Sequence, residues 1–215
     1  MPRYRSTSWR AFDPGALAGG ARVAPAKAAP VIRLSAVANP RILGLDPGSR
    51  RTGYGVIECG DTNSVPVAHG CIAATNGTFS ERLRQIFEGV QALIERYQPN
   101  EVAVERVFLN RNVESALKLG HARGAALCAV PGTVPVFEYA PRAIKLAVVG
   151  FGAAEKEQVA HMVRALLSVE GRLQPDASDA LAVAVCHAHS RRMHAITTSQ
   201  RVTVAVRTVV PGRNR

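Results

Sequence analysis

Four acidic residues stand where a carboxylate is chemically unusual: Asp46, Glu105, Asp176 and Asp179. Asp46 ends one apolar run, and Glu105 interrupts another that has the composition of a buried strand. Burying a lone carboxylate costs roughly several kcal/mol unless it is paired or bound to a metal. Asp176 and Asp179 are three residues apart at the start of an expected helix, and this spacing places both on one helix face.

The chemistry that these acids could carry depends on whether they meet. If the strands that contain Asp46 and Glu105 are neighbours, both carboxylates lie at the same end of the sheet, and the last helix can bring Asp176 and Asp179 there. Four carboxylates in one place repel each other strongly without cations. Oxygen ligands select hard ions such as Mg²⁺ or Mn²⁺. Two such ions, roughly 4 Å apart, activate water and stabilise the leaving oxygen in phosphodiester hydrolysis.

Each acid also has a purely structural interpretation. Asp46 precedes Pro-Gly-Ser and could be the first residue of an Asx turn. Asp176 follows Pro175 and could cap the helix, while Asp179 could complement the helix dipole. Glu105 has no comparable local role, because its strand should be apolar.

The surrounding elements follow from hydrophobic periodicity and from turn and cap signals. A capping box, Thr78 to Glu81, opens an amphipathic helix that Pro99 ends. Strands are predicted over Arg41–Asp46, Thr52–Cys59, Val65–Ala74, Glu101–Val107 and Val134–Tyr139. Helices are predicted after Thr78 and over Asn112–Val130, Pro141–Val149, Glu155–Leu167 and Asp176–Ser190. Three strands joined by short turns, followed by strand–helix crossovers, predict an α/β fold with a mixed five-stranded sheet and helices on both faces.

Several segments resemble those of the RuvC-type Holliday junction resolvases, a family of crossover junction endodeoxyribonucleases. The opening segment, Arg41-Ile-Leu-Gly-Leu-Asp-Pro-Gly-Ser-Arg-Arg-Thr-Gly-Tyr-Gly-Val56, is similar to the first acidic signature of that family. Val104-Glu-Arg-Val-Phe108 resembles the second acidic motif, and Asp176-Ala-Ser-Asp-Ala-Leu-Ala182 the closing one. Further matches follow in order over Ser115–Gly124, Pro135–Ala140, Lys145 with Val148–Gly150, and Ala154–Val159. The resemblance covers about residues 41–190.

The resemblance implies a ribonuclease-H-like fold and a homodimer that binds a four-way DNA junction. The enzyme would nick two strands of like polarity symmetrically, in homologous recombination and DNA repair, together with the RuvA–RuvB branch-migration complex in the bacterial cytoplasm. Asp46, Glu105, Asp176 and Asp179 would be the catalytic and metal-binding carboxylates. The cofactor would be Mg²⁺, two ions per site, with Mn²⁺ as a substitute.

The same resemblance assigns DNA contacts. Phe108 corresponds to an aromatic residue that stacks on an unpaired base, although a core phenylalanine is the alternative. Lys145 and Lys156 match basic positions near DNA, with a solvated face as the alternative, and Arg111 could meet phosphates. The histidines His187 and His189, by contrast, are expected at the rim or surface of the domain rather than as metal ligands.

Charge is concentrated in the ends of the chain. The net charge is +11, of which residues 1–40 contribute +5 and residues 191–215 contribute +6. We expect residues 1–40 to be a disordered basic extension, 41–190 the nuclease domain, and 191–215 a basic, flexible tail. No apolar run is long enough to predict a membrane span. Four cysteines without metal-site spacing, Cys59, Cys71, Cys128 and Cys186, are expected to be small buried side chains.

Three other functions remain open on the sequence. A nuclease of the same fold could act on RNA or on other branched DNA. The turn from Asp46 to Gly53 also fits sugar kinases and chaperone ATPases, but those proteins need two such domains and a second phosphate loop. A binding-only junction protein would not need all four acids.

Overall fold

The five predicted strands and five predicted helices all occur, in the predicted order. The computed structural model describes residues 34, 37–60, 62–106 and 112–207, with side chains described as far as Met193 in the last helix. The strands are β1 (Arg41–Asp46), β2 (Arg51–Cys59), β3 (Ser64–Ala73), β4 (Glu101–Glu105) and β5 (Val136–Tyr139). The helices are α1 (Phe79–Tyr97), α2 (Val113–Cys128), α3 (Pro141–Val149), α4 (Lys156–Leu167) and α5 (Pro175–Arg207).

The strands form one mixed sheet in the order β3-β2-β1-β4-β5. β1 pairs with β2, and β2 with β3, in antiparallel fashion, because short turns join them. β4 lies parallel to β1, and β5 lies parallel to β4, after helical crossovers. The predicted α/β architecture is therefore confirmed, and β1 and β4 are neighbours.

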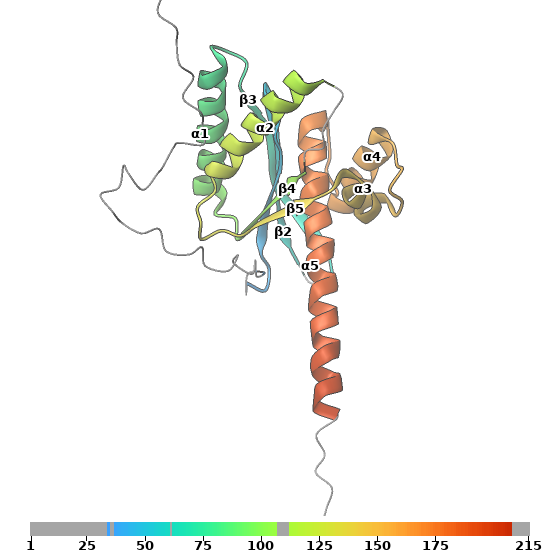
Figure 1. The fold of residues 1–215 in the computed structure, drawn as a ribbon. Helices are drawn as coiled ribbons and strands as arrows, with labels where there is room; N and C mark the ends of the chain where they lie inside the picture. The colour runs from blue at the N-terminus through green and yellow to red at the C-terminus, as the bar shows by residue number, and fades with distance from the viewer. Residues whose placement is uncertain (1–33, 35–36, 61, 107–111, 208–215) are drawn as a thin grey trace, which may run out of the picture. The chain divides into compact units, whose positions relative to one another are not determined.

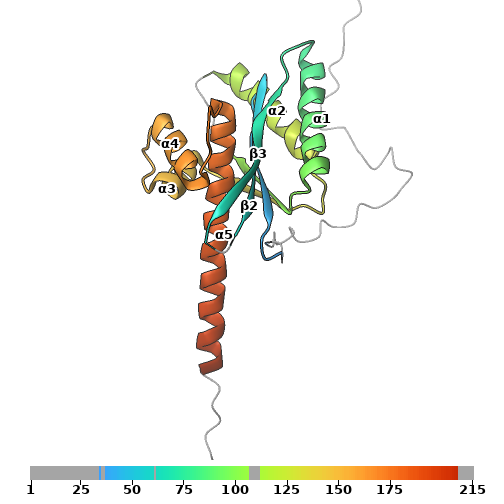
Figure 2. The ribbon, with the colours of Figure 1, turned by 180° about the vertical axis from the view of Figure 1, so that it is seen from behind.

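Helices cover both faces of the sheet and create two separate cores. α1 and α2 lie on one face, and α3, α4 and α5 lie on the other (Figures 1 and 2). The first face buries Leu43, Leu45 and Val104 against α1 and α2, whereas the second buries Ile42, Ile57 and Ala103 against α3, α4 and α5. Alternate residues of β1 thus enter opposite cores, as the two-residue period of a strand requires.

Local signals explain where the helices begin. Thr78 and Glu81 form the predicted capping box of α1. Asn112 accepts a hydrogen bond from the backbone N–H of Ser115 and so caps α2, and Pro141 begins α3, where its missing N–H is not needed. None of the helices among the described residues is long and apolar enough to cross a bilayer.

The last helix is longer than predicted, because α5 continues past Ser190 to Arg207. Its first residues beyond Ser190 are held against the domain. Arg191 bonds the Glu101 carboxylate, and Arg192 donates to the carbonyl oxygen of Gly60 at 3.1 Å. Long-range contacts that the local sequence does not reveal therefore hold the first two residues of the segment that was expected to be a flexible tail.

The cysteines differ in environment. All four are free thiols; Cys59 and Cys186 are buried as expected, whereas Cys71 is half-buried and Cys128 is exposed. The expectation of four buried cysteines was therefore wrong for Cys128, which lies at the end of α2 on its outer side. The expected extension over residues 1–40 falls largely outside the described residues.

Candidate active site

Asp46 and Glu105 lie side by side at one end of the sheet. The parallel pairing of β1 and β4 matches Leu45 with Val104, and the two acids are the next residue in each strand. The parallel register therefore produces the convergence that the sequence left conditional.

Two glycines let α5 approach the same end of the sheet. Gly53 lies opposite Asp46 in the β1–β2 ladder, and a Cβ there would collide with the backbone of Asp176. A Cβ at Gly44 would collide with the carbonyl oxygen of Ala180. Only glycine leaves room for the helix backbone at these two positions. The first turns of α5, which carry Asp176 and Asp179, consequently reach the strand ends that carry Asp46 and Glu105.

Burial and the neighbouring acids raise the pKa values of two of these carboxylates. Burial, together with the charges of Asp179 and Asp176, raises the pKa of Asp46 to about 6. Burial, followed by the charges of Asp46 and Asp179, raises the pKa of Glu105 to about 7. Lys156 opposes both shifts, but does not cancel them. The cluster carries more negative charge than its own lysines neutralise.

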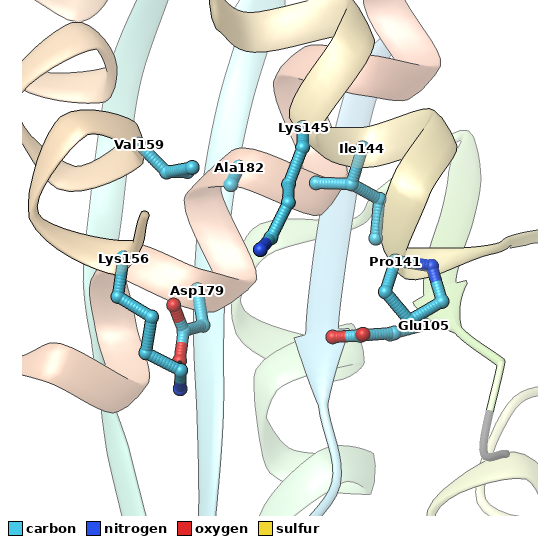
Figure 3. A pocket seen from close by; sticks show the side chains of 8 residues that line it. All are labelled: Glu105, Pro141, Ile144, Lys145, Lys156, Val159, Asp179 and Ala182. Atoms are coloured by element: carbon cyan, nitrogen blue, oxygen red, sulfur yellow. The ribbon is translucent and has the colours of Figure 1, made fainter. Parts of the chain in front are cut away.

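A pocket opens beside these carboxylates. Its volume is about 280 Å³, and Glu105 and Asp179 line it together with Lys145 from α3 and Lys156 from α4 (Figure 3). Apolar side chains of α3, α4 and α5 complete the wall: Pro141, Ile144, Val159 and Ala182. Two acids and two amines around one small cavity can receive a phosphate together with cations.

The two acids of α5 each accept a hydrogen bond from a basic side chain. Asp176 accepts a hydrogen bond from the Nε of Arg51 at 2.6 Å, and Asp179 accepts one from the Nζ of Lys156 at 3.1 Å. Within the residues described, no three Asp, Glu, His or Cys side chains are gathered closely enough, as they stand, to hold one ion. The donor chemistry nevertheless fits hard divalent cations, because all four ligand candidates are carboxylates, and burial together with the charges of neighbouring acids raises the pKa values of Asp46 and Glu105.

Some contacts of the site were not predicted. Arg51, the first residue of β2, pairs with Asp176, and the Cys71 thiol also lies 3.7 Å from that carboxylate. Arg123 donates to the carbonyl oxygen of Glu105 at 3.3 Å and pairs with Glu138 at 2.7 Å. Arg123 therefore supports the strand end that carries Glu105. A basic residue on a helix gives no local signal for such a partner. Phe108 and Arg111, expected to contact DNA, lie outside the described residues.

The two histidines of α5 differ. His187 is 1% exposed, so its expected rim or surface position was wrong. His189 is half-buried and donates to the carbonyl oxygen of Ala147 at 2.9 Å. The apolar sequence around His187 signals burial, but its polar partners come from β4 and β5 and are not evident from the sequence.

Known proteins resemble this chain over most of its length. The family model described as "Crossover junction endodeoxyribonuclease RuvC" matches residues 42–187. A protein with that name from Methylococcus capsulatus is 56% identical over 153 residues, which cover 71% of this chain and 92% of the relative. The Xanthomonas euvesicatoria protein of that name is 55% identical over 154 residues, covering 70% and 88% of the two chains.

Solved structures of Holliday junction resolvases also resemble this chain. Thermus thermophilus RuvC in complex with Holliday junction substrate is 36% identical, with a TM-score of 0.67, and the match covers 72% of this chain and 96% of the other. The yeast mitochondrial Holliday junction resolvase is only 12% identical, with a TM-score of 0.55 over 79% of this chain and 90% of the other. That second likeness shows a shared fold.

Proposed function

Because the chain belongs to the RuvC family of crossover junction endodeoxyribonucleases, we propose that it cuts four-way DNA junctions by symmetric, Mg²⁺-dependent nicking of two strands of like polarity. The observation that carries this proposal is the group of four carboxylates, coupled through their charges, beside a pocket that also contains two lysines. A binding-only protein would gain nothing from keeping so many repelling charges together.

We assign the catalytic role to the carboxylates. Asp46, Glu105, Asp176 and Asp179 would hold two divalent cations, with Arg51 and Lys156 released from the α5 acids when the cations bind. When bound, Mg²⁺ or Mn²⁺ lowers the pKa of water and offsets the negative charge that develops on the phosphate. The carboxylates fix the position of that chemistry, and the apolar wall of the pocket limits access of bulk water.

The lysines are suited to the DNA backbone. Lys145 and Lys156 extend from α3 and α4 into the pocket (Figure 3), where their amines can bind the phosphate that is cut. Lys156 is 80% exposed, so it can leave Asp179 for a phosphate with little loss of burial. Phe108 would stack on an unpaired base near the junction, and Arg111 would contact a neighbouring phosphate.

The assembly is part of the same proposal. Two copies of the chain would supply the two cuts of a symmetric reaction, and Val113 and Leu117 on α2 are apolar side chains that are 70% and 58% exposed and available for a second copy. The dimer would act with the RuvA–RuvB branch-migration complex in recombination and repair in the cytoplasm of a bacterium.

The decisive experiment compares a labelled four-way junction with a linear duplex of matched sequence. Each DNA is incubated with the wild-type protein in Mg²⁺ or in EDTA, and with the Asp46→Asn protein in Mg²⁺. We expect paired nicks in two junction strands of like polarity only when the junction is incubated with the wild-type protein in Mg²⁺. Junction binding without nicks would contradict the nuclease assignment, and equal cutting of junction and duplex would contradict the substrate assignment.

A further inference from the structure

A second acidic residue of β4, Glu101, is fully buried at the opposite end of the strand from Glu105. Its side chain is 0% exposed. One carboxylate oxygen lies 2.7 Å from the Nε2 of His187, and the other lies 2.7 Å from a guanidinium nitrogen of Arg191. Both partners belong to α5, the helix that carries Asp176 and Asp179.

His187 also contacts two aromatic residues of β5. Its Nδ1 lies 2.6 Å from the hydroxyl oxygen of Tyr139, and its ring stacks on Phe137 with the centroids 4.3 Å apart. Tyr139 pairs with Glu105 in the β4–β5 ladder, so the contact leads back to the strand end that carries the candidate active site. The contacts of His187 therefore join α5 to the two parallel strands β4 and β5.

The distance from the candidate active site to the contact between His187 and Glu101 is similar along α5 and along β4. His187 is eight residues beyond Asp179, which corresponds to about 12 Å along a helix. Glu101 is four residues before Glu105, which corresponds to about 13 Å along a strand. Chain direction is opposite in the two elements. The hydrogen bond between His187 and Glu101 thus connects α5 with β4 at one end. Asp179 of α5 and Glu105 of β4 lie at the other end.

We propose that Glu101, His187, Arg191 and Tyr139 form a positioning cluster that sets the register of α5 on β4, and with it the distance between Asp179 and Glu105. This inference rests on the proposed function of the acids as metal ligands. The cluster touches neither substrate nor cation, and acts through the helix.

Stability alone does not explain such a cluster. Replacing a buried ion pair with well-packed apolar side chains is often neutral or stabilising, so the charges are not needed to bury this surface. The glycines of β1 and β2 let α5 lie close to the sheet, but they carry no side chain whose directed hydrogen bonds could fix the helix against small axial shifts. Hydrogen bonds with fixed directions do not tolerate such shifts, and they select one register.

The test uses two amides at one position. In His187→Gln the side-chain nitrogen can occupy the place of Nε2 and keep the bond to Glu101, whereas in His187→Asn the shorter side chain reaches only toward Tyr139. Direct Mn²⁺ binding is measured by electron paramagnetic resonance, and the Mg²⁺ dependence of junction cleavage is measured in parallel. Val163→Ala, a truncation of a buried residue in α4, is the control for lost stability.

We expect His187→Asn to weaken Mn²⁺ binding about tenfold, the lower end of what loss of an orienting partner of metal ligands costs. The Mg²⁺ concentration for half-maximal cleavage should rise in proportion, with an unchanged KM for the junction at saturating Mg²⁺. His187→Gln should stay within about twofold of wild type in both measurements, and Val163→Ala should lower Tm without weakening Mn²⁺ binding.

Equal Mn²⁺ affinities in the two amide variants, or a loss in Val163→Ala as large as in His187→Asn, would overturn the positioning role. If His187→Asn does not fold, Tyr139→Phe removes only the hydroxyl that orients His187, and an unchanged Mn²⁺ affinity there would also overturn it. A wild-type protein that binds Mn²⁺ but does not cut junctions would overturn the proposed function alone, because Mn²⁺ binding still compares the variants. Failure of wild type to bind Mn²⁺ would overturn both.

Discussion

The two ends of β4 each carry a glutamate, and the fold treats them in opposite ways. Glu101 is completely buried, yet His187 and Arg191 both bond its carboxylate. Glu105 is less buried than Glu101, but burial and then the like charges of Asp46 and Asp179 raise its pKa to about 7. Fixed protein partners thus neutralise the buried carboxylate of Glu101, whereas Glu105, a candidate ligand for an exchangeable cation, lies beside other acids.

The same substitution at the two ends should therefore have different consequences. Glu105→Gln should lower the rate of junction cleavage by roughly 10³-fold, because loss of the proposed metal ligand would remove several kcal/mol of transition-state stabilisation. In EDTA the same variant should raise Tm, because it removes one of the repelling charges. Single-turnover cleavage and thermal unfolding measure the two effects. A Glu105→Gln variant that cuts junctions at the wild-type rate would show that Glu105 is not part of the catalytic site.

Glu101→Gln should instead destabilise the protein. It leaves Arg191 without its buried counter-charge, and breaking a buried pair from one side costs about 3 kcal/mol. Urea unfolding of the variant and of wild type, both in EDTA, gives the difference. An unfolding free energy equal to that of wild type would mean that the cluster around Glu101 is less dependent on charge than its geometry indicates.

The pH dependence of stability tests the end of the sheet that carries Asp46 and Glu105. The pKa of Asp46 is about 6 in the folded protein and 3.8 in an unperturbed aspartate, so the folded state retains a proton that the unfolded state has already released. Stability conferred by the protonated group is complete below pH 4 and is lost as pH rises through 6. In EDTA wild type should therefore lose about 2 kcal/mol more than Asp46→Asn between pH 4.5 and pH 8.

Urea unfolding at those two pH values checks this slope. Saturating Mg²⁺ should reverse the loss for wild type near pH 8, because a cation competes with the proton for the same carboxylates. Identical pH profiles for wild type and Asp46→Asn in EDTA would show that Asp46 ionises normally in the folded protein.

The smallest effect concerns one hydroxyl. Tyr139→Phe removes the hydrogen bond to His187 while keeping the ring, and should lower the free energy of unfolding by about 1 kcal/mol. Its urea midpoint should fall without a change in the slope of the transition. A loss as large as that of Glu101→Gln would mean that Tyr139, rather than the ion pair, is the main support of His187.

Much of the fold was predictable because its signals are local. Periodicity, the capping box at Thr78 and the turn after Asp46 depend on residues only a few positions apart, and they predicted the order of all strands and helices. Glu105 was identifiable as a candidate for chemistry because a carboxylate contradicts the apolar pattern of its strand. The conditional convergence of Asp46 and Glu105 needed only one further fact, the pairing of β1 with β4.

The sequence by itself determined the elements, the family resemblance and the four acids, since each is encoded in a short segment. The tertiary structure alone decided the partners: Arg51 on Asp176, Arg123 behind Glu105, and the burial of His187 against Glu101. It also carried α5 past Ser190, where Arg191 meets a strand 90 residues earlier in the chain. Such contacts depend on the register between elements, and register comes from packing whole surfaces together rather than from any local pattern.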